Sequence, residues 1–285
     1  MKATEIDLKG VTTAEEALEI AGANWEAEEE EMVTTSGIAV PDFRSIIRSD
    51  TRKVIGVVGK KFKPIQNSFA FSFFDTVCQG YGANYTKAYE FDGGKKMSLE
   101  AELGDPFLVR KGDEIISKIR VFNAFDRTYP LFAQFSIWRK VCSNGLHAWK
   151  NENKVVIRHT KNAEGRVADA MKVLALGNKY FEKFQETSKK LAEKILDKKQ
   201  VEFFLKECFG EGDGTRKQNL EEKVLERYEA GKGTGEGTAW DLYNGYCEWI
   251  DHDRSTTQET RLANSILGAV PLKEKAFDVA LELTR

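Results

Sequence analysis

Cys142 and His147 place a thiol and an imidazole five residues apart in the stretch RKVCSNGLHAW, residues 139–149. Such a pair could supply a nucleophile with its general base, or two ligands for a metal ion. A catalytic thiol also needs a group that orients its base, and none is close in sequence. Because Asn144-Gly145 is a strong turn signal, we interpret the stretch as a strand end, a turn and the start of the next element, with Cys142 packed in the strand.

The spacing of the histidines and cysteines does not match a known metal-binding pattern. The histidines and cysteines are scattered, and neither a CxxC pair nor an HExxH pattern occurs. We therefore expect no bound metal, no cofactor and no catalytic residue. One alternative stays open, a metal-dependent nuclease that uses His252 and Asp251 of the stretch IDHD together with a distant ligand.

The glycine-rich stretch GKGTGEG, residues 231–237, has the composition of a loop that cradles phosphate. It lacks the spacing of a Walker loop, and it does not follow a convincing strand. We interpret it as a flexible connector between two helices.

Charge is distributed unevenly, although the net charge is only −2. Residues 1–50 carry 4 basic and 12 acidic side chains, residues 51–190 carry 25 and 14, and residues 191–285 carry 14 and 19. A basic middle between acidic flanks favours a polyanionic partner, although lysines that merely solvate a surface give the same count. Aromatic residues are interleaved with these cations, and cations beside rings are the minimal equipment for binding single-stranded nucleic acid.

The elements that must position these residues form an α+β pattern. We expect a central antiparallel sheet with flanking helices and a helical C-terminal third, because no helical pattern separates the middle strands. The turn Asp92-Gly93-Gly94 suits a positive φ. Strands are predicted in a hairpin over 43–59 and at 85–91, 95–103, 114–125 and 131–143.

Helices are predicted where capping residues precede apolar residues at helical spacing. The long pattern over 166–196 contains Gly177 as a candidate interruption, and Thr238 is a plausible cap. The other predicted helices span 14–24, 67–80, 199–209, 219–230, 238–252 and 273–283. The acidic run at 26–31 is typical of a solvated face or a loop.

Composition and organisation indicate a soluble chain of three parts. Hydrophobic residues make up 41%, and no apolar run approaches the length of about 20 residues that a membrane helix needs. The opening MKATEIDLKG has no signal-type hydrophobic segment, so we expect a cytoplasmic protein. The expected parts are an acidic N-terminal helix and linker at 1–42, an α+β core at 43–200, and a helical region at 201–285 packed on the core.

Four stretches together resemble a family of phage- and plasmid-borne proteins that is catalogued as a domain of unknown function. They are VVGKKFKPIQN, RKVCSNGL, VVIRHT and GTAWDLYNGYCEWIDH, and the resemblance covers about residues 54–255. It implies a protein of a bacterial mobile element and brings no agreed activity. It marks these positions: Gly59, Phe62, Pro64, Gln66, Asn67, Arg139, Cys142, Asn144, Arg158, His159, Thr160, Trp240, Tyr243, Asn244 and His252. Position 62 of this chain is phenylalanine where the family usually has tyrosine, which weakens any role for a hydroxyl there.

The predicted order of helix, antiparallel strands and long helix is also similar to the core of phage single-strand annealing proteins, which assemble into rings with DNA along a basic groove. This similarity implies a homo-oligomer that binds single-stranded DNA in recombination and is not an enzyme. In that interpretation cations contact phosphate and Phe62 or Trp138 stacks on a base. The predicted nucleic-acid-binding residues are Lys60, Lys61, Phe62, Lys63, Arg120, Trp138, Arg139, Lys140, Asn144, Arg158 and His159.

A second hypothesis concerns a protein partner. The acidic segment 26–31 could mimic a phosphate backbone, or bind a host factor and so inhibit a defence system. Under this hypothesis deletion of the segment abolishes partner binding, whereas under the DNA hypothesis it preserves or enhances DNA binding.

Overall fold

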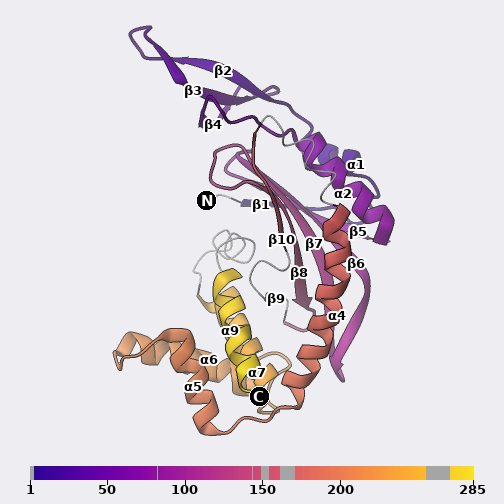
Figure 1. The fold of residues 1–285 in the computed structure, drawn as a ribbon, viewed down its shortest axis with the longest axis vertical. Helices are drawn as coiled ribbons and strands as arrows, with labels where there is room; N and C mark the ends of the chain where they lie inside the picture. The colour runs from indigo at the N-terminus through magenta and orange to yellow at the C-terminus, as the bar shows by residue number, and fades with distance from the viewer. Residues whose placement is uncertain (1–2, 82, 143, 149–153, 161–170, 255–269) are drawn as a thin grey trace. The chain divides into compact units, whose positions relative to one another are not determined.

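A computed structural model describes the chain except for residues 1–2, 82, 143, 149–153, 161–170 and 255–269 (Figure 1). The chain forms two compact units, and each is discontinuous in sequence. The first unit consists of residues 1–104, 118–135 and 154–176, and the second of 105–117, 136–153 and 177–285. The boundaries predicted at 42/43 and 200/201 fall inside these units.

The main sheet is antiparallel, and the prediction of an α+β fold is confirmed. Its strands are ordered β1-β5-β6-β7-β8-β10, and β9 pairs with β8. The strands are β1 (Ala3–Asp7), β5 (Asn84–Phe91), β6 (Lys96–Arg110), β7 (Asp113–Ala124), β8 (Leu131–Arg139), β9 (Asn144–Leu146) and β10 (Lys154–Ile157). Between β5 and β6, Asp92, Gly93 and Gly94 have φ values of 52°, 73° and 91°, as predicted for this turn.

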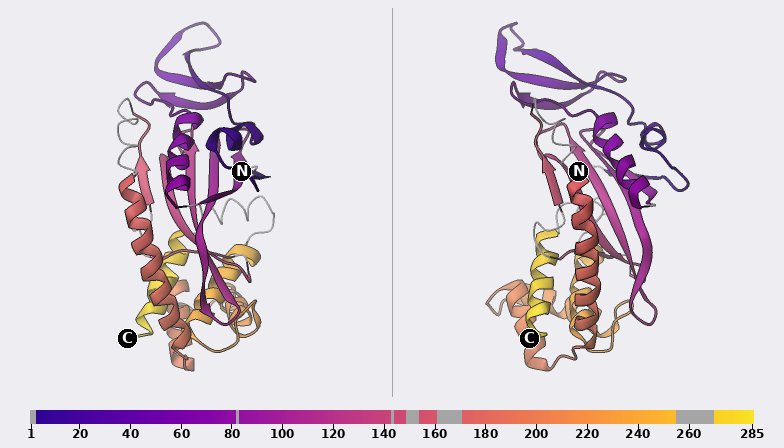
Figure 2. Two further views of the ribbon diagram at one scale, coloured as in Figure 1. Left: turned by 90° about the vertical axis from the view of Figure 1, so that its right-hand side faces the viewer. Right: turned by 45° about the vertical axis from the view of Figure 1, so that its right-hand side comes forward.

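Two helices of the first unit pack on one face of its strands (Figures 1 and 2). Helix α1 (Ala14–Ile20) begins at Thr13, whose hydroxyl accepts a hydrogen bond from the N–H of Glu16. Helix α2 (Asn67–Tyr81) is fixed to the sheet by Asn67, whose side chain accepts a hydrogen bond from Asn123 of β7 at 3.1 Å. Both helices occupy the predicted positions, although α1 is shorter than expected.

A smaller sheet in the first unit is formed by β2 (Ala27–Val33), β3 (Ala39–Arg48) and β4 (Val54–Gly59). The hairpin predicted over 43–59 corresponds to β3 and β4. Segment 26–31 is not a loop, because most of it forms strand β2. The close approach of β4 to the backbone of Phe125 requires a glycine at position 56, where a Cβ would lie 2.2 Å from the Phe125 carbonyl oxygen.

The second unit contains most of the helices. These helices are α5 (Lys198–Phe209), α6 (Thr215–Ala230), α7 (Ala239–Glu248), the π-helix η2 (Trp249–Asp253) and α9 (Val270–Glu282). The second unit also contains the portion of α4 (Met171–Glu193) from residue 177 onward. Thr238 caps α7 through a capping box with Asp241, as predicted for Thr238. Helix α4 continues through Gly177, so this glycine is no interruption. Among the helices that the structure describes, none is both long and apolar enough to cross a membrane.

The Asn144-Gly145 pair is not a turn. Arg139 of β8 pairs with Asn144 of β9, and the turn lies before Asn144, at residues 140–142. Two side chains hold the Gly145 backbone in the strand: Asp251 accepts from its N–H at 3.1 Å, and Lys273 donates to its carbonyl at 2.6 Å. A turn signal in sequence is overridden here by contacts more than a hundred residues away.

Candidate nucleic-acid interface

Two of the four sequence motifs meet in the first unit. The ring of Phe62, in the linker between β4 and α2, stacks on the ring of His159 beyond β10, with centroids 4.6 Å apart and planes 13° apart. The N–H of Lys63 donates to the carbonyl of His159 at 3.2 Å, and the N–H of Ile65 donates to its Nδ1 at 3.3 Å. These contacts join segments that are 94 residues apart in sequence.

His159 contributes a neutral ring to this cluster. Burial lowers its pKa to about 4, although an interaction of the ring with the Lys63 backbone opposes the shift. The imidazole is therefore uncharged at pH 7. Because Nδ1 accepts from Ile65, the proton belongs on Nε2, which has no hydrogen-bond partner in the described part of the chain. His159 therefore supports Phe62 and adds no positive charge.

Four exposed cations lie on the same two segments as this pair of rings: Lys60, Lys61, Lys63 and Arg158. We call these cations and Phe62 the Phe62 surface. Lys60 Nζ lies 2.7 Å from Asp42 Oδ1, and this contact lowers the pKa of Asp42 through a hydrogen bond and through charge. Exposed ion pairs of this kind contribute at most about 1 kcal/mol, so a phosphate can compete for the lysine.

Two of the four cations have no side-chain partner among the described residues. Lys63 Nζ lies 2.8 Å from Glu29 Oε1, so Lys63 resembles Lys60 in having a carboxylate partner. No hydrogen bond or ion pair joins the side chain of Lys61 or Arg158 to any residue that the structure describes. These two side chains are the cations of the surface that are most open to an external anion.

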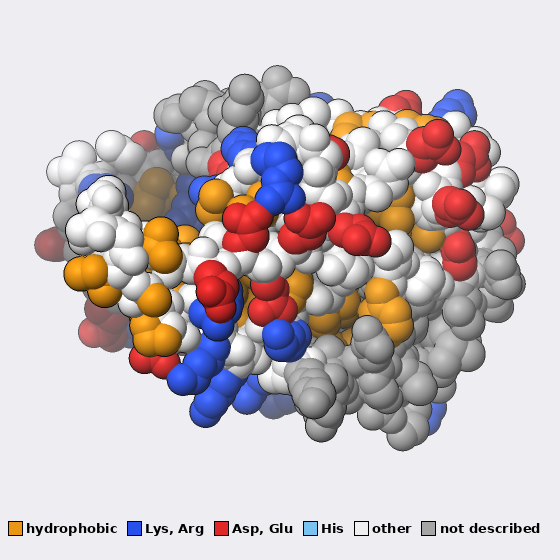
Figure 3. Space-filling model, turned by 90° about the horizontal axis from the view of Figure 1, so that it is seen from above, with side chains coloured by type: hydrophobic (Ala, Val, Ile, Leu, Met, Phe, Trp, Pro, Cys, Tyr) orange, Lys and Arg blue, Asp and Glu red, His pale blue; other side chains and the backbone are white. Residues whose placement is uncertain are grey.

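The acidic segment 26–31 is neutralised largely by cations of the same unit. Arg52 forms ion pairs with both Glu28 and Glu30, and Lys63 pairs with Glu29. Glu31, whose side chain is 87% exposed, has only a contact of 3.7 Å to Arg44. Figure 3, seen from above relative to Figure 1, shows acidic and basic side chains close to one another, in keeping with these ion pairs. The segment is therefore not a free acidic surface in this structure.

Arg120, a predicted DNA contact, is buried in the first unit. Its Nη2 bonds Glu100, whose other oxygen lies 2.8 Å from Lys118 Nζ. Burial alone would raise the pKa of Glu100, but Arg120 and Lys118 outweigh it and lower the pKa. Arg120 is 4% exposed, so it cannot reach a phosphate in this conformation. Its role here is to satisfy a buried carboxylate.

The other two motifs meet in the second unit, around Arg139. The Arg139 guanidinium binds Asp113 with two hydrogen bonds of 2.6 Å, and Trp240 Nε1 donates to the same carboxylate at 2.8 Å. Arg139 is fully buried. Burial alone would lower its pKa, but the contact with Asp113 outweighs it and raises the pKa. The structure therefore gives Arg139 an internal partner in place of the predicted phosphate.

The backbone of the glycine-rich loop 231–237 is held by hydrogen bonds with side chains of the second unit. Arg139 donates to the carbonyls of Lys232 and Gly233, and Arg110 donates to the Gly233 carbonyl at 2.6 Å. Several N–H groups of the loop are also occupied: Glu248 accepts from that of Lys232, and Asp241 accepts from that of Glu236. The interpretation as a flexible connector therefore needs correction, because arginines and carboxylates fix the loop.

Cys142, Asp251 and His252 also have structural partners in the second unit. Cys142 is buried, and its carbonyl lies 3.0 Å from His252 Nε2. Both oxygens of Asp251 contact the fully buried Lys273 Nζ, the longer contact being 2.6 Å. Within the described residues, no group of three or more metal-ligating side chains lies close enough to hold an ion. Nothing in this arrangement favours the nuclease hypothesis.

The remaining predicted residues also lie in the second unit. Trp138 is half-buried in β8, and Lys140 is exposed with its Nζ 2.7 Å from Glu114. Asn144 is described only by its backbone, in β9. The eleven predicted residues are thus divided between the two units, and Lys60, Lys61, Phe62, Lys63, Arg158 and His159 are brought together.

Sequence reasoning missed the carboxylates that moderate the Phe62 surface. Glu29 and Asp42 precede it by at least 18 residues and reach it only through pairing of β2, β3 and β4. A cross-strand alignment of the acidic run with the hairpin could have suggested these pairs, because opposite charges on neighbouring strands attract.

A sequence profile of the family described as Domain of unknown function (DUF932) matches residues 54–267. The chain belongs to this family, which agrees with the resemblance to a family of unknown function noted from the four motifs. No curated protein and no solved structure matches the chain.

Proposed function

We propose that the protein binds single-stranded DNA through the Phe62 surface. The support comes from one observation: two segments 94 residues apart bring four exposed cations to the stacked rings of Phe62 and His159. Cations that follow a backbone beside a ring that can stack on a base are what single-strand binding requires. Because His159 covers one face of the half-buried Phe62 ring, a base would have to stack on the opposite face.

The proposed biological setting is DNA recombination on a phage or plasmid in the cytoplasm of a bacterial host, with strand annealing as the activity of a homo-oligomer. The resemblance of the four motifs to phage- and plasmid-borne proteins supports this setting. The similarity of the predicted topology to annealing proteins supports it in a more general way.

The proposal is tested by charge reversal at the two unengaged cations. A double variant Lys61→Glu, Arg158→Glu is compared with the wild type by fluorescence anisotropy of a labelled single-stranded oligonucleotide. Each lost phosphate contact and each added repulsion weakens binding, and we expect a loss of about tenfold or more.

Lys9→Glu is the matched control, because Lys9 is exposed in the same unit and belongs to neither segment of the surface. The control carries one charge reversal and should bind nearly as the wild type does. Equal affinity of the double variant and the wild type would contradict the proposal, provided that both proteins melt at the same temperature.

A further inference from the structure

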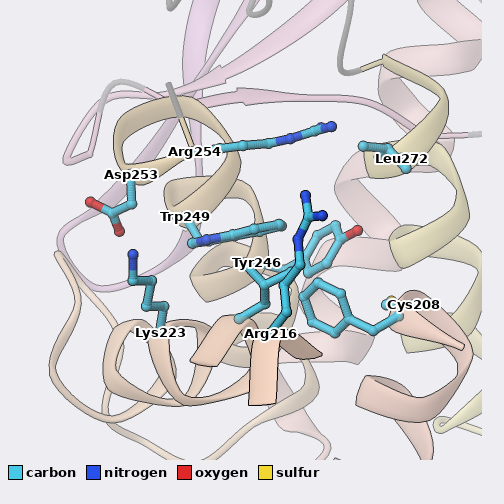
Figure 4. Close-up of a pocket in the computed structure, with 10 residues that line it drawn as sticks. Cys208, Arg216, Lys223, Tyr246, Trp249, Asp253, Arg254 and Leu272 are labelled. Carbon is cyan, nitrogen blue, oxygen red and sulfur yellow. The ribbon is translucent and has the colours of Figure 1, made fainter. Parts of the chain in front are cut away.

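A second constellation of rings and cations lies among the helices of the second unit, at residues that the sequence did not predict as a site. A pocket of about 460 Å³ is formed there by α5, α6, α7, η2 and α9 (Figure 4). This volume is within the range of about 300–1,000 Å³ that is usual for small-molecule sites. The pocket lies entirely within one unit, so its geometry does not depend on how the two units are arranged.

The wall of the pocket is aromatic. The rings of Phe209, Tyr246 and Trp249 contact one another pairwise, with centroids 5.3–5.6 Å apart. Tyr246 and Trp249 are buried and Phe209 is half-buried, so the cluster is firmly packed. A packed wall of rings offers a flat aromatic ligand a surface for stacking.

Three cations line the pocket: Arg216 and Lys223 from α6, and Arg254 at the end of η2. Figure 4 shows the Lys223 amine pointing toward Asp253. All three are exposed, and none forms an ion pair or a side-chain hydrogen bond with a described residue. Among the described residues of the wall, the only carboxylate is Asp253, and Arg227 occupies both of its oxygens at 2.9 Å. The described lining therefore carries three cations and one carboxylate, an excess of positive charge.

The π-helix explains why ring and cation meet. The N–H of Arg254 donates to the carbonyl of Trp249, five residues earlier, at 2.9 Å. This wider turn brings the side chain of Arg254 over Trp249, as Figure 4 shows. Single π-helical turns occur frequently at functional sites, since an ordinary helix is the more stable local structure.

We propose that this pocket binds a nucleoside phosphate. The base would lie against Trp249 and its neighbouring rings, and the phosphates would be held by Arg216, Lys223 and Arg254. The ring wall and the cations match the two halves of such a ligand, whereas an aromatic ligand without charge would leave the cations unused. The inference concerns a different unit and a different ligand from the Phe62 surface and stands independently of it.

Isothermal titration calorimetry with ADP, GDP, CDP and UDP tests the proposal, with adenosine and inorganic pyrophosphate as half-ligands. At least one diphosphate should bind more than tenfold more tightly than either half-ligand. Removal of one charge-assisted hydrogen bond typically costs about tenfold or more, so Arg216→Ala, Lys223→Ala and Arg254→Ala should each weaken binding by at least that factor.

The controls separate this site from general charge effects. Lys199→Ala, an exposed lysine of α5 outside the pocket, should bind the diphosphate as the wild type does. A 5′-phosphorylated oligonucleotide, measured in the Lys61→Glu, Arg158→Glu variant so that the Phe62 surface contributes little, distinguishes the source of the ligand: tighter binding of the oligonucleotide indicates a strand end, and tighter binding of the free diphosphate indicates a free nucleotide. The absence of diphosphate binding at millimolar concentration, or undiminished binding in the triple alanine variant, would overturn the proposal.

Discussion

Arg139 provides a sharp test of the structural reasoning, because sequence and structure assign it different roles. The sequence predicts a phosphate contact, whereas the structure places its guanidinium in a fully buried pair with Asp113. Arg139→Met removes both hydrogen bonds to the carboxylate and the clamps on the carbonyls of loop 231–237. Asp113 is then left buried with a hydrogen bond from Trp240 and a looser contact of 3.7 Å with Arg110 Nε.

The size of the effect follows from the burial of both groups. Breaking a buried pair by removing one partner costs about 3–5 kcal/mol, a large share of the roughly 5–15 kcal/mol by which proteins are usually stable. We expect Arg139→Met to lower the midpoint of urea unfolding accordingly, measured by circular dichroism. Lys140→Met is the matched control, because the neighbouring Lys140 is 61% exposed and its ion pair with Glu114 is worth at most about 1 kcal/mol.

A double variant identifies the cause of the loss. In Arg139→Met, Asp113→Asn the buried charge is absent, so part of the lost stability should return. Below its melting temperature, Arg139→Met should keep its affinity for single-stranded DNA. A variant with normal stability and weakened DNA binding would refute the structural role and restore the role predicted from sequence.

Three further predictions concern the protonation of His159 and the ion pairs of Asp42 and Lys273. The pKa of His159 in the folded protein is about 4, below the usual 6.5, so the unfolded chain binds the proton at a higher pH than the folded protein does. The free energy of unfolding should therefore fall by about 3 kcal/mol between pH 6.5 and pH 4. Urea midpoints across this range should show this fall, and His159→Asn should show a smaller one. Asp42→Asn frees Lys60 from its ion pair and should strengthen binding of single-stranded DNA in an anisotropy titration, since a repelling charge is lost as well; weaker binding would contradict it. Lys273→Met leaves Asp251 buried and unpaired and should cost about 3–5 kcal/mol in a urea melt, whereas the exposed neighbour Lys275→Met should cost almost nothing.

The local elements could be predicted because their signals are local. Thr238 caps α7, and Asp92, Gly93 and Gly94 form the turn between β5 and β6, because each conformation depends on residues within a few positions. The acidic run at 26–31 lacks such a signal. It becomes strand β2 because β3 lies beside it and supplies both backbone partners and a compensating arginine.

The candidate sites could be predicted only in part, because burial depends on distant partners. Arg139 and Arg158 each directly follow apolar residues in the sequence, yet Arg139 is buried in a pair with Asp113, whereas Arg158 is exposed. The pocket is harder still to foresee, since Arg216 and Arg254 are brought to one space by helix packing and by a π-turn. The net acidic composition of residues 191–285 gives no sign of the three cations that gather at this pocket.

The salt dependence of single-strand binding tests the central claim most directly. The affinity of the wild type for a labelled oligonucleotide should fall linearly on a logarithmic plot against salt, with a slope between about −1.5 for two phosphate contacts and about −3 for four. Competition with duplex should show a preference for the single strand, because only unpaired bases can stack on Phe62. No binding at low salt, or binding that is insensitive to salt, would contradict the account.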